Sequence, residues 1–327
     1  NNNPKLILIS PFLFFLLLIG CENSFTLQNQ YIDPQIIFSS RRWWNYDIFI
    51  ADTHGGHLTQ LTKNKWIDFN PSISRDGKKL SFISDRDGNR EIYITELEWL
   101  DGYSQWRGND LKNISNTFEN EWTPVFSPIE DKIVYTAYFP ENDNYDIFIM
   151  NDDGTNKYNL TNSTSYEKFP QFSPDGSFLI YQGWQKGKME IFFLGLLDKN
   201  NINITRNVKS NDILSHGNSI SPDGQSIVFT SERDGNRNIY LMRINGSEIK
   251  QLTFHESNDY EPVFSSDGQS IAFTSERDGN KEIYLISPDA KNLKNLTNNS
   301  GNDWNSRFYK DSQKIIFQST RDGNWEI

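Results

Sequence analysis

The chain has 327 residues, a formal net charge of −11 and one cysteine. A chain of this length holds either two ordinary domains or one large repeat fold. The acidic balance, with no run of Lys or Arg, argues against a nucleic-acid surface, because phosphate binding needs clustered cations. The lone cysteine excludes an intramolecular disulfide and a Cys-x-x-Cys site.

The N-terminus predicts an export signal. Lys5 precedes an apolar stretch from Leu6 to Ile19, which is short for a membrane span but of signal-peptide length. The stretch closes with LIGC, which resembles the bacterial lipobox and implies that Cys21 is lipidated. An ordinary cleaved signal peptide and an anchor helix are the alternatives. We expect a lipoprotein signal peptide at 1–20 and a tether at 21–34. The protein would then be lipid-anchored in the bacterial cell envelope, on the periplasmic or outer-membrane face.

The remainder of the chain, residues 35–327, is a repeat. The string SERDGN occurs at 231–236 and 275–280, with close copies at 84–89 and 319–324. An insertion around Trp99 to Asp110 lengthens the second copy, and we expect it to be a surface loop. The aromatic residue preceding this turn marks seven copies: Phe38, Phe82, Tyr135, Tyr181, Phe229, Phe273 and Phe317.

One copy, residues 260–297, shows what each repeat forms. Short apolar runs alternate with Asp-Gly and Pro-Asp turn clusters, which predicts four antiparallel strands. Their expected ranges are Pro262–Ser265, Ser270–Ser275, Glu282–Ser287 and Leu293–Thr297. Repetition of this unit predicts an all-β propeller with four-stranded antiparallel blades.

The seven second strands favour seven blades, with six and eight as the alternatives. The last blade is truncated in its third strand. We expect the ring to be closed by residues 25–31 or by a strand beyond Ile327.

The motifs FSPDG at 172–176, ISPDG at 220–224 and FSSDG at 264–268 resemble TolB-like (WD40-like) β-propeller repeats. The same repeats are related to the propeller blades of dipeptidyl peptidase IV and prolyl oligopeptidase. These motifs are hairpin and packing residues, so they specify fold more strongly than function. The resemblance implies a non-catalytic envelope lipoprotein that binds a protein partner or a cell-wall or carbohydrate ligand.

The connections between blades, which should ring one mouth of the propeller channel, pair an acid with an aromatic or large apolar residue. Such a ring would suit a cationic peptide, a sugar or a metal. Alternatively, the aromatic residues wedge between blades and the acids cap turns. Residues that break the symmetry are the better binding candidates. The predicted binding residues are Lys65, Trp66, Trp122, Lys168, His216, Tyr260, Trp304 and Arg307.

The sequence contains no GxSxG elbow, Walker A loop or HExxH motif. Asp85, Asp87 and Asn89 alternate as calcium ligands might, but the glycine position does not fit an EF-hand, and an Asp-Gly hairpin explains them. We therefore predict no catalytic residue, metal or cofactor. Two enzyme alternatives stay open. One is the propeller of a peptidase of the two groups named above, with its hydrolase domain beyond Ile327. The other is a lyase or hydrolase in the channel mouth.

Overall fold

The computed structural model describes residues 5–6, 13–18, 35–42, 45–53, 56–100, 105–206, 212–213, 220–309, 312–323 and 327. The regular structure within these ranges consists of strands. No helix in the same ranges is long and apolar enough to cross a membrane.

The described residues form seven sheets, which we number as blades 1 to 7. Blade 1 contains β2 (Leu13–Leu18), β3 (Gln35–Arg42), β4 (Asn45–Asp52) and β5 (Thr59–Gln60). Blade 2 contains β6 (Asp68–Ile73), β7 (Lys79–Ser84), β8 (Glu91–Leu100) and β9 (Gln105–Asn113). Blade 3 contains β10 (Asn120–Phe126), β11 (Lys132–Phe139), β12 (Asn144–Asn151) and β13 (Tyr158–Asn159).

Blade 4 contains β14 (Glu167–Phe172), β15 (Phe178–Gln185), β16 (Lys188–Gly195) and β17 (Asn201–Asn203). Blade 5 contains β18 (Asp212–Ile213), β19 (Ser226–Ser231), β20 (Asn238–Arg243) and β21 (Lys250–Gln251). Blade 6 contains β22 (Asp259–Phe264), β23 (Ile271–Ser275), β24 (Glu282–Ile286) and β25 (Lys294–Asn295). Blade 7 contains β26 (Asp303–Phe308), β27 (Lys314–Ser319) and β1 (Lys5–Leu6).

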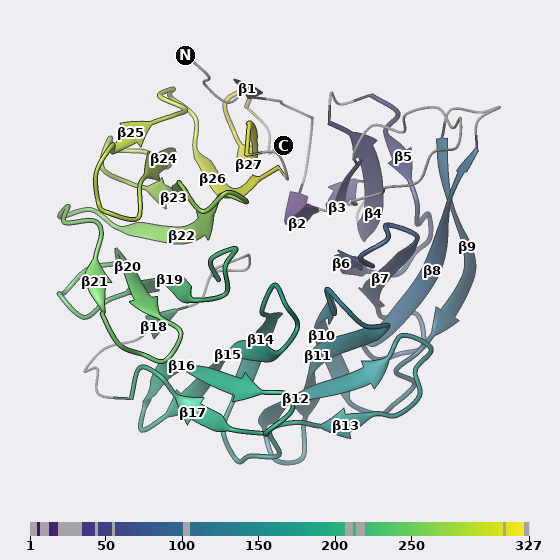
Figure 1. Cartoon of the computed structure of the whole chain (residues 1–327). Coiled ribbons are helices and arrows are strands. Elements are labelled where there is room, and N and C mark those ends of the chain that lie inside the picture. Colours follow the sequence, from purple (N-terminus) through teal and green to yellow (C-terminus); the bar gives the residue numbers. More distant parts are fainter. Residues whose placement is uncertain are drawn as a thin grey trace, which may run out of the picture.

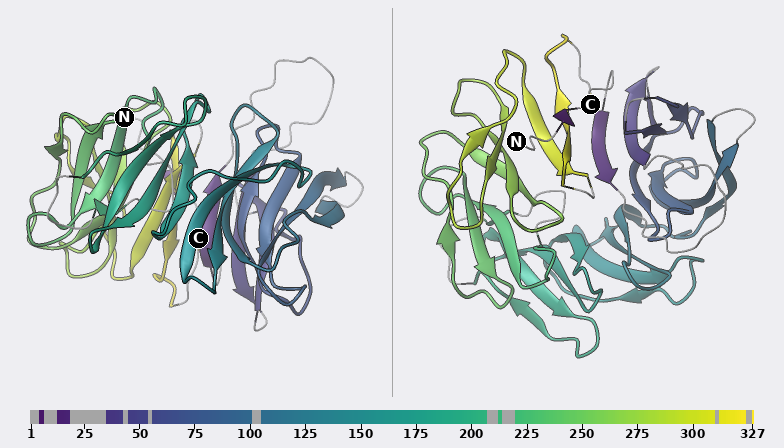
Figure 2. Two further views of the ribbon diagram at one scale, coloured as in Figure 1. Left: turned by 90° about the horizontal axis from the view of Figure 1, so that it is seen from below. Right: turned by 45° about the horizontal axis from the view of Figure 1, so that its top comes forward.

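The blades stand around a common axis, with the first strand of each four-stranded sheet nearest that axis and the fourth at the outer rim (Figure 1). The tilted views in Figure 2 show the sheets side by side around the ring. The architecture confirms the all-β propeller and the seven blades predicted from the repeat.

The seven aromatic residues that defined the repeat form the centre of the blades. All are buried and lie on second strands: Phe38, Phe82, Tyr135, Tyr181, Phe229, Phe273 and Phe317. Phe229, for example, packs in one cluster with Ile180 of blade 4 and Tyr240 of its own blade. The apolar side chains of neighbouring blades therefore share one core at each interface, as a repeat fold requires.

Ring closure differs from the expectation. Leu13–Leu18 forms β2, which pairs antiparallel with β3 and lies beside both β6 and β26. Residues 25–31, where a closing strand was expected, lie outside the described residues. So do Cys21 and the tether, and the signal peptide stays a prediction.

The insertion in the second copy is not a loop. It lengthens β8 and β9 into a hairpin whose pairing continues to Leu100 opposite Gln105. Trp99 lies directly opposite Trp106, and their ring centroids are 5.4 Å apart. Cross-strand aromatic pairs stabilise antiparallel strands, which explains why the insertion is ordered as a hairpin.

We predict that Phe229→Ala lowers the free energy of unfolding by about 3–5 kcal/mol, because it leaves a cavity at the interface of blades 4 and 5. Urea denaturation followed by circular dichroism measures this. The matched control is Phe118→Ala, since that side chain is 99% exposed and its loss should change little. Equal stability of the two variants would contradict the burial of Phe229.

Candidate functional site

The arginine of the SERDGN-type turn holds the innermost strand of its own blade. In blade 6, Arg277 donates to Asp259 at the start of β22 at 2.8 Å and lies 4.6 Å from the centre of the Tyr284 ring. Its Nε also donates to Ser275 Oγ at 2.8 Å. Blades 2 and 7 repeat the ion pair with Arg86–Asp68 and Arg321–Asp303. We call this arginine–aspartate pair the latch.

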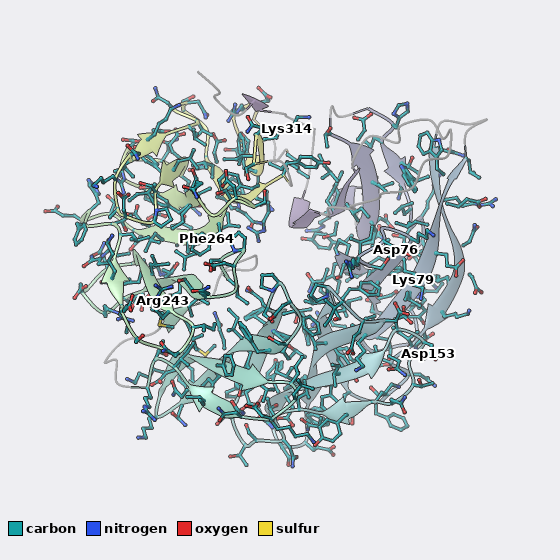
Figure 3. All side chains as sticks on the ribbon, in the orientation of Figure 1. Asp76, Lys79, Asp153, Arg243, Phe264 and Lys314 are labelled. Carbon is teal, nitrogen blue, oxygen red and sulfur yellow. The ribbon has the colours of Figure 1, made fainter. Side chains whose placement is uncertain are left out.

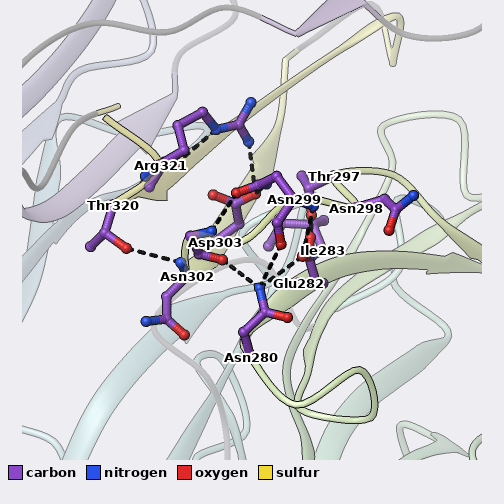
Figure 4. Close-up of polar contacts among 12 residues, drawn as sticks. Asn280, Glu282, Ile283, Thr297, Asn298, Asn299, Asn302, Asp303, Thr320 and Arg321 are labelled. Atoms are coloured by element: carbon purple, nitrogen blue, oxygen red, sulfur yellow. Dashed lines mark hydrogen bonds and ion pairs between the residues drawn. The ribbon is translucent and has the colours of Figure 1, made fainter. Parts of the chain in front are cut away.

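The asparagine of the same turn joins each blade to the next. In Figure 4, the Asn280 side-chain amide donates to the main-chain carbonyls of Asn299 and Gly301, in the loop that leads into blade 7. Asn299 in turn donates to the latch acid Asp303 at 2.6 Å. The turns and the inter-blade loops therefore lie together on one face of the ring, which we call the loop face.

The Asp of the turn is hydrogen-bonded within its own hairpin. Asp87 accepts hydrogen bonds from the Tyr93 hydroxyl and from Asn113. The hydrogen bond from Tyr93 holds the Asp87 pKa below its usual range. Within the described residues, no group of three or more His, Cys, Asp or Glu side chains is arranged to hold a metal ion.

The expected ring of carboxylates is not presented to a ligand. Five of the first-strand acids are at most 5% exposed, whereas Glu261 on β22 is partly exposed; the five are Asp68, Glu121, Glu167, Asp259 and Asp303. They are buried because they fasten inner strands and inter-blade loops, through the latch or through hydroxyl donors. An acidic mouth that attracts a cationic peptide was therefore a wrong interpretation of these residues.

Half-buried cations and aromatic rings lie against one another on the loop face. Arg90 Cζ lies 3.8 Å from the centre of the Trp122 ring and 5.6 Å from that of Phe69. On the other side of the ring, Lys281 Nζ lies 5.7 Å from both Tyr260 and Trp304. Each cation follows the asparagine of a turn and is placed between the aromatic residues of its own and the next blade. These contacts are cation–π interactions.

Blades 3 and 4 carry a different version of this arrangement. The hairpin joining β11 to β12 lacks the arginine turn, and Tyr138 and Tyr145 pack together at 4.6 Å between ring centroids. Lys168 Nζ lies 3.5 Å from the centre of the Tyr145 ring, and burial lowers the Lys168 pKa. Asp143 accepts the Tyr166 hydroxyl at 2.6 Å. We call Arg90, Trp122, Tyr145, Tyr166 and Lys168 together the aromatic–cation cluster.

The structure brings together some of the predicted binding residues and separates others. Trp122 and Lys168 belong to the cluster, whereas Tyr260 and Trp304 flank Lys281 in blades 6 and 7. Lys65 is exposed and stacks on its neighbour Trp66 at 5.3 Å. His216 lies outside the described residues.

Arg307 does not reach the loop face. It lies on β26, its guanidinium donates to the Ser306 carbonyl at 2.7 Å, and burial lowers its pKa to about 10. It is 7% exposed, so it belongs to the interior of blade 7.

Sequence reasoning missed Arg90, Lys281, Tyr138 and Tyr145. A signal for the two cations was present, because a basic residue follows the asparagine of the turn at Arg90, Arg237 and Lys281. The tyrosine pair could not be found in this way, because it depends on the register of the β11–β12 hairpin.

The latch is absent from blades 3 and 4 in the described residues. The register places Ala137 and Gly183 where the latched blades have serine, so Glu121 and Glu167 face no arginine. Burial raises the pKa of Glu121, with a further contribution from Glu91. Burial likewise raises the pKa of Glu167 to about 7, and its Oε2 has no hydrogen-bond partner. Both carboxyl groups therefore keep their proton at pH values well above the usual pKa of a glutamate.

Residues 129–287 match the family model of the TolB β-propeller domain. A TolB homologue of Chlorobium luteolum is 28% identical over 161 residues, covering 49% of this chain and 34% of that protein. The chain is a β-propeller protein. Over residues 129–287 its repeats are similar to those of the TolB β-propeller domain.

Solved structures share the fold at lower identity. A putative TolB from Agrobacterium tumefaciens superposes with a TM-score of 0.54 at 20% identity, covering 73% of this chain and 83% of that one. A puromycin-hydrolyzing peptidase of Mycobacterium tuberculosis gives 0.65 at 13%, covering 86% and 51%. An oligogalacturonate lyase in complex with manganese gives 0.61 at 16%, covering 78% and 75%. At these identities the likeness concerns the fold alone.

The matched segment spans about a quarter to a half of the length of the curated relatives. What a whole TolB-like protein does is therefore not transferred to this chain by the match.

We predict that Glu167 makes the protein less stable as pH rises from about 4.5 to 7. In that range the folded state keeps the Glu167 proton that the unfolded chain has lost, so the free energy of unfolding falls by up to about 3 kcal/mol. Glu167→Gln, which mimics the protonated form, should match the parent near pH 5 and exceed it at pH 8.

Thermal unfolding across this pH range measures the effect. Glu130→Gln is the control, because Glu130 is an exposed residue paired only with Lys132. If the melting temperature of Glu167→Gln changes with pH in parallel with that of the parent, Glu167 ionises normally and the prediction is wrong.

Proposed function

We propose that this chain is a non-catalytic binding protein of the bacterial cell envelope, and that its loop face binds an acidic segment of a protein partner. The observation that carries the proposal is the aromatic–cation cluster. Arg90 and Lys168 are held against aromatic rings on a face where most of the first-strand carboxylates are buried. An acidic segment with an aromatic residue would meet both the cations and the rings.

Charge supports the choice of an acidic partner. The chain carries 43 Asp and Glu against 32 Lys and Arg, so an acidic ligand is repelled by most of the surface. Arg90 and Lys168, which belong to one cluster on the loop face, give such a ligand a specific place to bind. Specificity in this arrangement comes from repulsion elsewhere as well as attraction at the site.

The enzyme alternatives have less support. A peptidase and a lyase share the propeller fold, but at 13% and 16% identity this likeness identifies no activity. The described residues of the loop face offer buried latch acids and stacked cations, and neither set is a free pair of carboxylates that could serve as acid and base. The binding interpretation is therefore preferred.

We predict that a labelled twelve-residue peptide of Asp, Glu and one Trp binds, with an affinity that falls as salt is added. Arg90→Gln and Lys168→Gln should each weaken binding by about tenfold, which corresponds to about 1.4 kcal/mol. Fluorescence anisotropy measures both.

Arg243→Gln is the matched control. Arg243, labelled in Figure 3, is an exposed cation paired with Glu248, and it ends β20 opposite the loop face. The proposal would be wrong if the same peptide with Lys in place of its acids bound more tightly. It would also be wrong if the protein preferred oligogalacturonate to the acidic peptide.

The anchoring half of the proposal rests on Cys21. We predict that cells expressing the protein incorporate labelled palmitate and that Cys21→Ser abolishes the label. Processing at Cys21 would remove Leu13–Leu18, so a cleaved leader and strand β2 exclude each other in the mature protein. The mass of the mature N-terminus decides between them, and an unacylated protein that retains residues 1–20 would refute the anchor.

A further inference from the structure

The inter-blade loops of the loop face share one backbone frame. In four of the described loops, the amide of an asparagine at the end of the turn donates to main-chain carbonyls before and after a single residue. Asn89 donates to Thr117 and Glu119, on either side of Phe118, at 3.1 and 2.6 Å. The equivalent bonds come from Asn45 around Lys65, from Asn236 around Glu256 and from Asn280 around Ser300.

A side-chain hydrogen bond to the next blade also fixes these loops. The residue before the central one is tied to the buried acid of the next blade: Thr117 to Glu121 at 2.5 Å and Asn299 to Asp303 at 2.6 Å. Asn144 makes one such carbonyl contact, to Ser163, beside Thr164. The central residues, which we call tips, are thus held by main-chain contacts independent of their own side chains.

The tip side chains differ in chemistry, but all of them are exposed to solvent. They are Lys65, Phe118, Thr164, Glu256 and Ser300. Because the frame is built from neighbouring residues, folding places no demand on the tip side chain. Variable side chains on a fixed backbone are the arrangement of a recognition surface.

Phe118 is the tip that points to a partner. It is 99% exposed, and Phe254, the next most exposed aromatic among the described residues, lies on an inter-blade loop of the same face at 75%. Aromatic residues on rigid loops contribute disproportionately to protein interfaces, because they bury a large area at little entropic cost. Phe118 lies on the loop that leads to Trp122 of the aromatic–cation cluster, and Phe254 lies on the loop between blades 5 and 6 of the same face.

The geometry points to Phe118 as the anchor of this surface, inserted into an apolar pocket of a folded protein partner whose rim carries carboxylates. The rim chemistry follows from Lys65 and Lys63, both exposed on the neighbouring inter-blade loop, and from Arg90 beneath it. This inference rests on the proposed function, since the acidic segment and the pocket would belong to the same partner.

The test is a comparison of variants that fold alike. The parent, Phe118→Ser and the reciprocal Ser300→Phe are immobilised and exposed to an envelope extract of the source bacterium. A protein retained by the parent is purified and titrated against each variant by calorimetry. We expect Phe118→Ser to lose at least thirtyfold in affinity, Ser300→Phe to bind like the parent, and all three to melt at the same temperature.

Two further variants separate this inference from the proposed function. Arg90→Gln tests the binding of the acidic segment. Ile129→Ser is the control for Phe118→Ser, because it removes an exposed apolar side chain from the turn at the opposite end of blade 3. Loss of binding in Phe118→Ser with normal acidic-peptide binding supports the anchor. Parental affinity in Phe118→Ser, retention of no protein, or a parent that sediments as a dimer and a variant that sediments as a monomer would each overturn it.

Discussion

The ring depends on how each blade neutralises the acid that starts its innermost strand. Asp259 is fully buried, and a buried carboxylate is costly unless it is paired and hydrogen-bonded. Arg277 supplies the pairing while stacking on Tyr284, and Asn280 of the same turn reaches the next blade. One hairpin thus closes its own blade and places the following loop, so the polar contacts and the apolar interfaces specify the same geometry.

Blades 3 and 4 show what happens when this solution is lost. With Phe139 in the arginine position, Glu121 faces no cation, and burial raises its pKa. The hairpin that no longer holds a latch carries Tyr145, and Lys168 stacks against its ring. Departure from the repeat therefore changes two things at once: the inner wall becomes sensitive to pH, and the loop face gains a distinct surface. Such departures are where function is expected in a repeat fold.

The sequence was sufficient for the fold because blade structure is local. Turn residues and the buried aromatic series predicted the strands and the seven blades. The site was less accessible, because the acid–aromatic connections look alike in sequence, and only the pairing register shows that the acids turn inward while Trp122 and Lys168 stay at the surface. Ring closure by Leu13–Leu18 was missed for a related reason, since an apolar run fits both a leader and an inner strand.

The hydrogen bonds that fix the inter-blade loops do not involve the tip side chains. These side chains can therefore vary without disturbing the ring. Asn89 and Asn280 make the same contacts although the residues they enclose are Phe118 and Ser300. A substitution at a tip therefore alters what the face presents without altering the position from which it is presented. A fold assembled from such frames can acquire a new partner through single side chains, because stability and recognition are carried by different atoms of the same loop.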